Sequence, residues 1–275
     1  MQVERNIQER TPKKLLTPAS GYLKGYSHTL NPYVGCAFGC SYCYVRRMPV
    51  ALFRKEEWGT WVDIKRSAKE SFKRELKNAK RKDPLTIFMS SSTDPYQPIE
   101  HREKITQALL ETMAEEPPDF LFVQTRSPLV TRDIELFRAL GKRVLISMTV
   151  ETDRDDIRKA FSLAAPPIPA RLKAMDTMKN AGLAVQAAVS PVLPSTEDFA
   201  KTLADHVSRV VVDDFFMGDG TGGKRTKQLG IHKLFKELDV EEWYNDKAYM
   251  KVVEDLEAYF PPDKLFISQE GFLPG

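Results

Sequence analysis

Short apolar runs recur along the chain, and each is followed by a segment with helical spacing. Six runs rich in Val, Ile and Phe predict strands at 27–34, 85–92, 120–127, 143–151, 183–192 and 209–217. A 3.6-residue period predicts helices at 62–82, 101–115, 131–141, 153–161, 168–181 and 196–208. Near-continuous apolar strands alternating with helices indicate a parallel sheet buried on both faces. The predicted class is α/β, and six units in about 190 residues favour a partial TIM-like (β/α)6 barrel.

The chain adds a segment at each end of this core. Residues 1–24 are polar and predict an irregular N-terminal arm, and the core is expected to span 25–217. Residues 218–275 predict a basic glycine-rich loop and a helical C-terminal extension, with helices at 231–239 and 246–259 and a last apolar run at 264–268. Gly141 and Gly182 precede two of the strands, where a helix commonly ends with a left-handed residue.

Composition limits the location and the partners that we expect. The 41 basic and 38 acidic residues give a net charge of +3, which does not require a nucleic-acid footprint over the whole chain. The first residues contain no apolar signal region, and no apolar run approaches the roughly 18 residues that span a bilayer. We therefore expect a cytoplasmic protein with no membrane partner.

All three cysteines lie in the stretch NPYVGCAFGCSYCY, at Cys36, Cys40 and Cys43. Clustered thiols in a reducing compartment indicate metal or redox chemistry, and an odd number cannot form a disulfide framework. A structural zinc site would need a further ligand such as His28, and a redox-active pair would leave Cys36 unexplained. An iron–sulfur cubane normally takes four thiolates, so three would leave one iron open to a reactant. The loop follows the first predicted strand, at the edge where barrel enzymes place their active sites.

The spacing C-x3-C-x2-C after the first strand, with the aromatic Tyr42 before the last cysteine, resembles the radical S-adenosylmethionine (SAM) superfamily. Three further signatures resemble its spore photoproduct lyase-like group, also called DNA repair photolyase-like: SSSTDPYQPIE, TRSPL and TVET. The resemblance implies an enzyme with a [4Fe–4S] cluster on Cys36, Cys40 and Cys43, whose open iron binds SAM. Reductive cleavage of SAM would give a 5′-deoxyadenosyl radical that abstracts hydrogen from the substrate.

The resemblance also implies which residues contact the cofactor. The expected contacts lie in the cysteine motif and at three strand ends: Tyr42, Ser92, Thr93, Asp94, Arg126, Thr149 and Glu151. Arg126 would pair with the SAM carboxylate, and Thr149 and Glu151 would contact the ribose hydroxyls. An Asx turn at Asp94 and a helix N-terminal carboxylate at Glu151 would explain those two residues without a ligand.

One departure from the lyase concerns the hydrogen donor. The lyase returns hydrogen from a cysteine just after the second strand, and Ser91 occupies the matching position here. A serine O–H bond is too strong to replace a thiol in that role, so the fold does not specify the reaction. Tyr96 is the candidate catalytic residue as a redox-active group, although packing beside Pro95 and Pro98 also explains it.

Basic residues give weaker indications of the substrate. Five of them share one face of the helix at 62–82, where they could track phosphates or form an ordinary solvated surface: Arg66, Lys69, Lys73, Lys77 and Lys80. Arg46 and Arg47 follow the cysteines and are candidates for contact with an anionic substrate. The loop GDGTGGKRT nearly matches a phosphate-binding loop, but Arg225 stands where Ser or Thr would bind magnesium, so nucleotide hydrolysis is not expected.

The expected partners are SAM, an external electron donor of the flavodoxin or ferredoxin type, and DNA or RNA as substrate. Two alternatives stay open. One is the same radical chemistry on a small metabolite or peptide, and the other is a non-catalytic, metal-stabilised interaction module.

Overall fold

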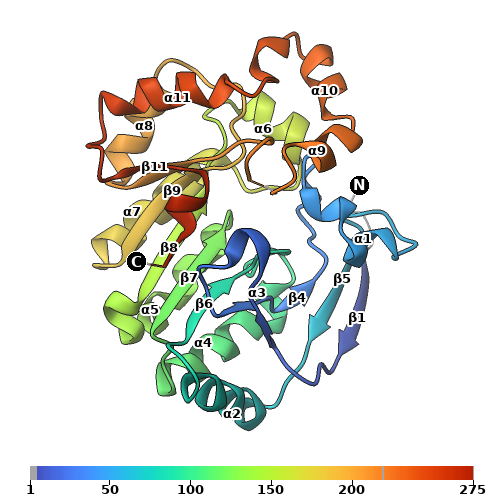
Figure 1. The fold of residues 1–275 in the computed structure, drawn as a ribbon, viewed down its shortest axis with the longest axis vertical. Coiled ribbons are helices and arrows are strands. Elements are labelled where there is room, and N and C mark those ends of the chain that lie inside the picture. Colours follow the sequence, from blue (N-terminus) through green and yellow to red (C-terminus); the bar gives the residue numbers. More distant parts are fainter. Residues whose placement is uncertain (1–4, 219, 275) are drawn as a thin grey trace.

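The computed structural model describes residues 5–218 and 220–274. Among these residues eight strands form one sheet in the order β11-β10-β9-β8-β7-β6-β3-β2 (Figure 1). From one edge to the other they are β11 (Leu265–Ile267), β10 (Val210–Val212), β9 (Ala184–Val189), β8 (Val144–Thr149), β7 (Phe120–Thr125), β6 (Thr86–Met89), β3 (His28–Leu30) and β2 (Leu16–Pro18). All neighbours pair in parallel except β2 and β3. The sheet has two edges, which confirms the predicted partial barrel.

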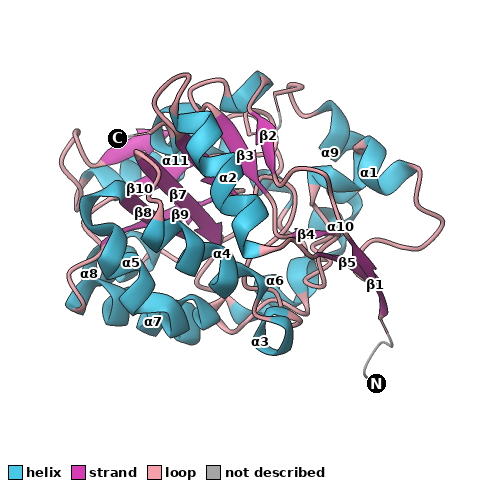
Figure 2. Cartoon of the chain, turned by 90° about the horizontal axis from the view of Figure 1, so that it is seen from below, coloured by secondary structure: helices cyan, strands magenta, loops and turns pink. Residues whose placement is uncertain are grey.

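Helices cover the outer face of this sheet (Figures 1 and 2). Six of them contribute buried apolar residues to the main core: α2 (Lys69–Lys80), α4 (Ile105–Glu115), α5 (Ile134–Leu140), α7 (Ile168–Asn180), α8 (Phe199–His206) and α11 (Ala248–Glu257). Two others pack around the cysteine segment, α6 (Asp155–Ser162) and α10 (Ile231–Glu237). The short helices are α1 (Pro49–Leu52), α3 (Glu100–Glu103) and α9 (Lys224–Gln228). The predicted helix at 131–141 begins as a 3-10 helix, Pro128–Asp133.

The two-residue period of the strands separates a helix-covered face from an inner face. Inner-face residues form a second apolar cluster, in which Phe88 and Phe122 stack with ring centroids 4.9 Å apart. Two residues further along each strand the inner face becomes polar, at Ser90, Gln124, Ser147 (followed by Thr149), Ser190 and Asp213. The apolar part fills the barrel interior, and the polar part lines the carboxyl ends of the strands.

Two predictions about the first 65 residues are wrong. Trp61–Lys65 forms strand β5 instead of the start of a helix, because its aromatic and β-branched residues are buried and favour strand. The N-terminal arm is not irregular, since its strand β1 (Asn6–Arg10) pairs in parallel with β5 and β2 joins the main sheet. The strand predicted at 27–34 is divided, and its end, β4 (Tyr33–Val34), pairs with β5.

Two smaller predictions, on two glycines and on the C-terminal extension, are confirmed. Gly141 and Gly182 have φ values of +61° and +80°. The C-terminal extension contains the two predicted helices, α10 and α11, and its last apolar run is β11. Among the described residues no helix is both long and apolar enough to span a bilayer. The predicted domain boundaries after residues 24 and 217 stay predictions. The main sheet takes β2 from the predicted arm and β11 from the predicted extension.

Candidate active site

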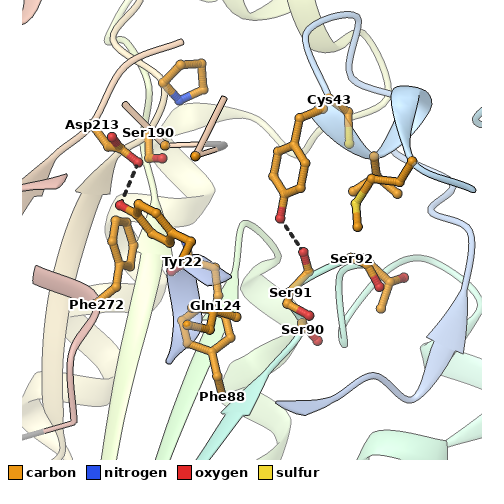
Figure 3. A pocket seen from close by; sticks show the side chains of 18 of the residues that line it. Tyr22, Cys43, Phe88, Ser90, Ser91, Ser92, Gln124, Ser190, Asp213 and Phe272 are labelled. Carbon is orange, nitrogen blue, oxygen red and sulfur yellow. Dashed lines mark hydrogen bonds between the residues drawn. The ribbon is translucent and has the colours of Figure 1, made fainter. Parts of the chain in front are cut away.

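A cavity of about 620 Å³ opens at the carboxyl ends of the strands, and small-molecule sites typically have this size. Figure 3 shows Cys43 on one side of it and Tyr22 and Asp213 on the other. The lining includes the three cysteines and six of the seven expected cofactor contacts: Cys36, Cys40, Cys43, Tyr42, Ser92, Thr93, Asp94, Arg126 and Thr149. The fold therefore brings residues from four chain segments to one place.

Backbone turns shape the cysteine loop, residues 35–43. The Gly39 amide donates to the Cys36 carbonyl at 3.2 Å, and the Cys43 amide donates to the Cys40 carbonyl at 3.2 Å. The three cysteines are free thiols, with Cys36 and Cys40 buried and Cys43 half-buried. Burial raises the pKa of Cys36 well above its usual range and that of Cys43 to about 12. A metal that binds these sulfurs must therefore displace their protons.

The segment after β6 holds the cysteine loop in place. The Thr93 hydroxyl donates to the Gly35 carbonyl at 2.5 Å, and the Gln97 side chain accepts from the Ala37 amide at 2.8 Å and donates to the Gly35 carbonyl at 3.3 Å. Thr93 thus binds the loop itself as well as lining the cavity. Gln97 is a contributor that the sequence analysis missed, although its place in the STDPYQP motif was a usable signal.

A buried network joins Arg126 to the cysteine loop. Arg126 Nη1 lies 2.5 Å from Glu151 Oε1 and 2.7 Å from the Tyr42 hydroxyl, which in turn donates to Glu151. Arg171 Nη1 binds the other oxygen, Glu151 Oε2, at 2.7 Å. Burial raises the pKa of Glu151, but Arg126 and Arg171 outweigh it and lower the pKa to about 2. Glu151 lies behind the cavity lining, and Arg171 on α7 belongs to no motif.

Asp94 ties the end of β6 to the end of β7. Its carboxylate accepts from the Thr125 hydroxyl at 2.7 Å, from the Arg126 amide at 2.9 Å and from the Tyr96 amide at 2.9 Å. The last of these is the expected Asx turn. Burial raises the pKa of Asp94, and these donors oppose that rise. Asp94 therefore has a structural function, whether or not it also contacts a cofactor.

Tyr96 does not line the cavity. It is buried, and its hydroxyl donates to Asp133 Oδ2 at 3.0 Å, so this placement favours the packing interpretation. Ser91 does line the cavity, and its Oγ accepts from Asn31 at 3.1 Å while its carbonyl accepts from the Tyr44 hydroxyl (Figure 3). The redox function of Tyr96 stays a prediction.

The other expected cofactor contacts lie on the cavity wall. The Thr149 hydroxyl accepts from Gln124 Nε2 at 2.6 Å, and the Ser92 amide donates to Asn31 at 3.0 Å. Arg46 donates to the Cys40 carbonyl at 3.0 Å and to the Gly39 carbonyl at 2.9 Å, so its guanidinium binds the cysteine loop.

The basic face of α2 is largely paired with acidic residues. Lys69 and Lys73 bind Glu115, and Lys80 binds Glu116. Arg66, which the sequence placed on this helix, lies before its first residue and binds Glu103 and Glu9. These pairs favour the solvated-surface interpretation over a phosphate-tracking one.

Two consecutive carboxylates lie on the side of the cavity opposite the cysteine loop. Asp213 and Asp214 directly follow β10 and are 3% and 6% exposed. Burial, together with the charge of Asp214, raises the pKa of Asp213 to about 7. The sequence analysis missed this pair. Two aspartates after an apolar strand were the available signal.

The loop after these aspartates forms part of the same wall. Gly218, Gly220, Thr221, Arg225 and Thr226 line the cavity. Asp219, which belongs to the predicted basic loop, lies outside the described residues.

Comparison with protein families matches residues 30–206 to the radical SAM superfamily, over more than half of the chain. The chain belongs to the radical SAM superfamily. Membership implies an enzyme, and it implies a [4Fe–4S] cluster and SAM as cofactors.

Three proteins from different organisms have sequences similar to this chain. Protein MJ0683 of Methanocaldococcus jannaschii is 30% identical over 68% of this chain and 67% of its own length. Protein ORF301 of Acidianus two-tailed virus is 30% identical over 82% of this chain and 70% of its own. Protein Mb2609c of Mycobacterium bovis is 27% identical over 65% of this chain and 53% of its own.

Solved structures confirm the fold. Spore photoproduct lyase complexed with a dinucleoside spore photoproduct has a TM-score of 0.66 and 14% identity, covering 95% of this chain and 81% of the lyase. Streptococcus suis SuiB bound to SAM has a TM-score of 0.50 and 13% identity, covering 77% of this chain and 44% of SuiB. At this identity the likeness establishes the architecture and not the reaction.

The donor set fits an iron–sulfur cluster. Three free thiols from one loop line a single cavity, and thiolates are the usual ligands of such clusters. Within residues 5–218 and 220–274, no three His, Cys, Asp or Glu side chains are grouped as one metal ion would need. Cluster ligands bind separate irons and need not converge on one point. Three thiols of one loop that line one cavity are therefore a ligand set of the kind that a cluster takes.

We expect Gly35→Ala to damage the cysteine loop. Gly35 has a φ of +84°, and a Cβ there would lie 2.7 Å from the ring and carbonyl oxygen of Trp61. Gly182→Ala is the matched control, because its φ is +80° but nothing lies within 4 Å of its added Cβ. The control should cost roughly 1–2 kcal/mol for its conformation, and Gly35→Ala roughly 1–3 kcal/mol more for the clash.

Thermal unfolding and iron content after anaerobic reconstitution measure both effects of the Gly35 substitution. Gly35→Ala should also bind less iron than the wild type, whereas Gly182→Ala should bind as much. Equal melting temperatures and equal iron content in the two variants would contradict this account of the loop.

We expect Asp213→Asn to change how stability depends on pH. The folded-state pKa of about 7 lies above the ordinary value of 3.8, so the folded protein holds this proton more tightly than the unfolded chain. Its stabilising contribution is present below about pH 4 and is lost as the pH rises toward 7, by up to roughly 4 kcal/mol. The melting temperature of Asp213→Asn relative to the wild type should therefore rise between about pH 5 and about pH 8.

Differential scanning fluorimetry at the two pH values measures this relative shift. Asp83→Asn, at an exposed position, is the control and should show no such change. The same difference between Asp213→Asn and the wild type at both pH values would show that this carboxyl titrates in its ordinary range.

Proposed function

We propose that this protein cleaves SAM reductively at a [4Fe–4S] cluster and abstracts hydrogen from a substrate in the same cavity, in a spore photoproduct lyase-like reaction. The observation that carries the proposal is the convergence of three free thiols, Tyr42 and Arg126 on one cavity. When bound, the cluster and SAM would supply a 5′-deoxyadenosyl radical, with the electron delivered by an external flavodoxin- or ferredoxin-type protein.

Arg126 is the residue best placed to bind the SAM carboxylate. Its side chain lines the cavity, and one nitrogen, Nη1, donates to both Glu151 and the Tyr42 hydroxyl. Glu151 fixes the guanidinium, and the second cation, Arg171, keeps Glu151 ionised. The position of Arg126 is therefore set before a ligand binds, which lowers the entropic cost of binding.

Ser92, Thr93 and Asp94 lie beside the cysteine loop, and we propose that they contact the amino-acid end of SAM. Thr149 lines the cavity at the end of β8, where it would meet the ribose. Glu151 contacts Tyr42 and two arginines, so its proposed effect on the cofactor passes through Arg126.

A nucleic-acid-related substrate is supported by the fold shared with a lyase solved with a dinucleoside. The paired charges on α2 favour a substrate that enters the cavity over a duplex bound along that helix. Ser91 faces the cavity without a thiol, so hydrogen return to a substrate radical needs another donor.

A peptide substrate is the second candidate, since SuiB has also been solved with a precursor peptide.

Cys40→Ala should abolish iron binding and SAM cleavage together, because removing one of three thiolates leaves too few ligands for a cluster. The measurements are iron and sulfide content after anaerobic reconstitution and deoxyadenosine release under dithionite. The wild type should hold four irons per chain. An intact cluster in Cys40→Ala would refute the ligand assignment, and one tightly held zinc in the wild type would favour the non-catalytic module.

Arg126→Ala should weaken SAM binding about tenfold to hundredfold with the cluster retained, as expected for losing a charged hydrogen bond of roughly 1.5–3 kcal/mol. Arg138→Ala removes an exposed arginine of α5 and serves as the control. Equilibrium binding of SAM to the reconstituted wild type and variants measures this change in affinity. Unchanged affinity in Arg126→Ala would remove this residue from the cofactor site.

A further inference from the structure

Hydrogen-bond acceptors gather on the cavity lining from its middle to the side opposite the cysteine loop. Asp213, Asp214, Gln124 and Ser90 belong to this stretch, and they come from the ends of β10, β7 and β6. Figure 3 shows Asp213 with Tyr22 on one side of the cavity, across from Cys43, with Gln124 and Ser90 between them. We call these four residues the acceptor wall.

Several atoms of the acceptor wall are buried without a partner. Asp214 Oδ2, Gln124 Oε1 and Ser90 Oγ form no hydrogen bond with the residues that the structure describes, and Asp214 and Ser90 are each 6% exposed. A buried polar atom without a partner costs free energy, and a ligand that supplies a donor recovers it. The residues that carry these atoms line a cavity large enough for a ligand, which makes this stretch a candidate binding surface.

The two carboxyl groups make this wall negative when they are ionised. Among the described residues, no recorded ion pair includes Asp213 or Asp214. The strongest charge acting on Asp213 is that of Asp214, and the strongest acting on Asp214 is that of Asp246. Asp213 accepts from the Tyr22 hydroxyl at 3.4 Å and from the Asp214 amide at 3.1 Å. A phosphate or carboxylate placed here would meet like charge.

One wall residue has a costly backbone conformation, and a glycine packs closely against another. Ser90 has a φ of +78°, which is rare for a residue other than glycine and clusters at functional sites. Gly218 passes so close to Asp213 that an added Cβ would lie 2.3 Å from Oδ2. The chain therefore fixes the carboxylate and the hydroxyl at the cavity surface.

We propose that the acceptor wall binds the substrate through hydrogens carried on nitrogen, either those of an ammonium group or those of the N–H edge of a base or amide. It would hold that group across the cavity from the cysteine loop and would reject a phosphate or carboxylate. The statement that this ligand is the substrate rests on the proposed function, whereas the binding chemistry of the wall does not.

Two pairs of probes test this chemistry on the reconstituted protein with SAM bound. Thymidine and N3-methylthymidine differ in one neutral N–H donor, and butylammonium and butyltrimethylammonium share a charge but differ in their donors. We expect the donor-bearing member of at least one pair to bind at least tenfold more tightly than its blocked partner in calorimetric titrations. The pair that responds identifies the source of the donor, and inorganic phosphate should not bind.

Substitutions connect the binding to the wall. Asp213→Asn and Asp214→Asn should each weaken the responding probe at least tenfold while SAM affinity stays the same, and the exposed control Asp83→Asn should change neither. Ser90→Gly relieves the backbone strain and removes the hydroxyl. It should therefore raise the melting temperature and weaken the probe, a combination that misfolding cannot produce.

Three results would overturn the proposal: no donor-bearing probe binds at millimolar concentration, the blocked analogues bind as tightly, or the aspartate substitutions weaken SAM as much as the probe. The last would assign the wall to the cofactor. Failure of the proposed function looks different, because the wild type would then bind the donor probes but release no deoxyadenosine under reduction.

Discussion

The site depends on side chains that hold the cysteine loop from outside it. Residues 35–43 make only short turns among themselves, so the direction of the three thiols is set by neighbours. Thr93 and Gln97 bind the loop backbone on one side, Arg46 binds two of its carbonyls, and the Phe161 carbonyl accepts from the Ser41 amide at 2.9 Å. Buried thiols repel once ionised, so a loop without these bonds could turn them apart. The STDPYQP segment therefore shapes the metal site without supplying a ligand.

A second constraint is the buried carboxylate of Glu151. It joins Arg126 at the end of β7, Arg171 on α7 and Tyr42 in the cysteine loop. A buried charge is costly unless it is paired and hydrogen-bonded, and two cations with one phenol meet that requirement here. Movement of any partner would leave the others unsatisfied. The network therefore fixes the cysteine loop relative to two strands and keeps a cation at the cavity surface.

The periodicity of the chain predicted the strands and helices of the core, because their buried faces follow periods of 2 and 3.6 residues. It failed at Trp61–Lys65. These five residues form a strand, but in the sequence they continue the helical spacing of the basic helix that follows them. The cysteines could be found because their spacing is local. Arg171 could not, since it meets Glu151 across 20 residues and no local pattern records such a contact. Gln97 and Asp213 had local signals, a motif and a pair of aspartates after an apolar strand, but their functions come from partners and a cavity that only the fold brings to them.

The two sides of the cavity differ in charge, and the difference bears on both proposals. Arg126 contacts Tyr42 of the cysteine loop, and Asp213 lies across the cavity from Cys43 (Figure 3). The carboxylate of SAM would be attracted to Arg126 and repelled by the aspartates, so both walls favour the same orientation of the cofactor. A substrate group with N–H donors would experience the opposite preference. On both proposals the charge pattern would separate cofactor from substrate within one cavity, with Ser91 on the lining between the two sides.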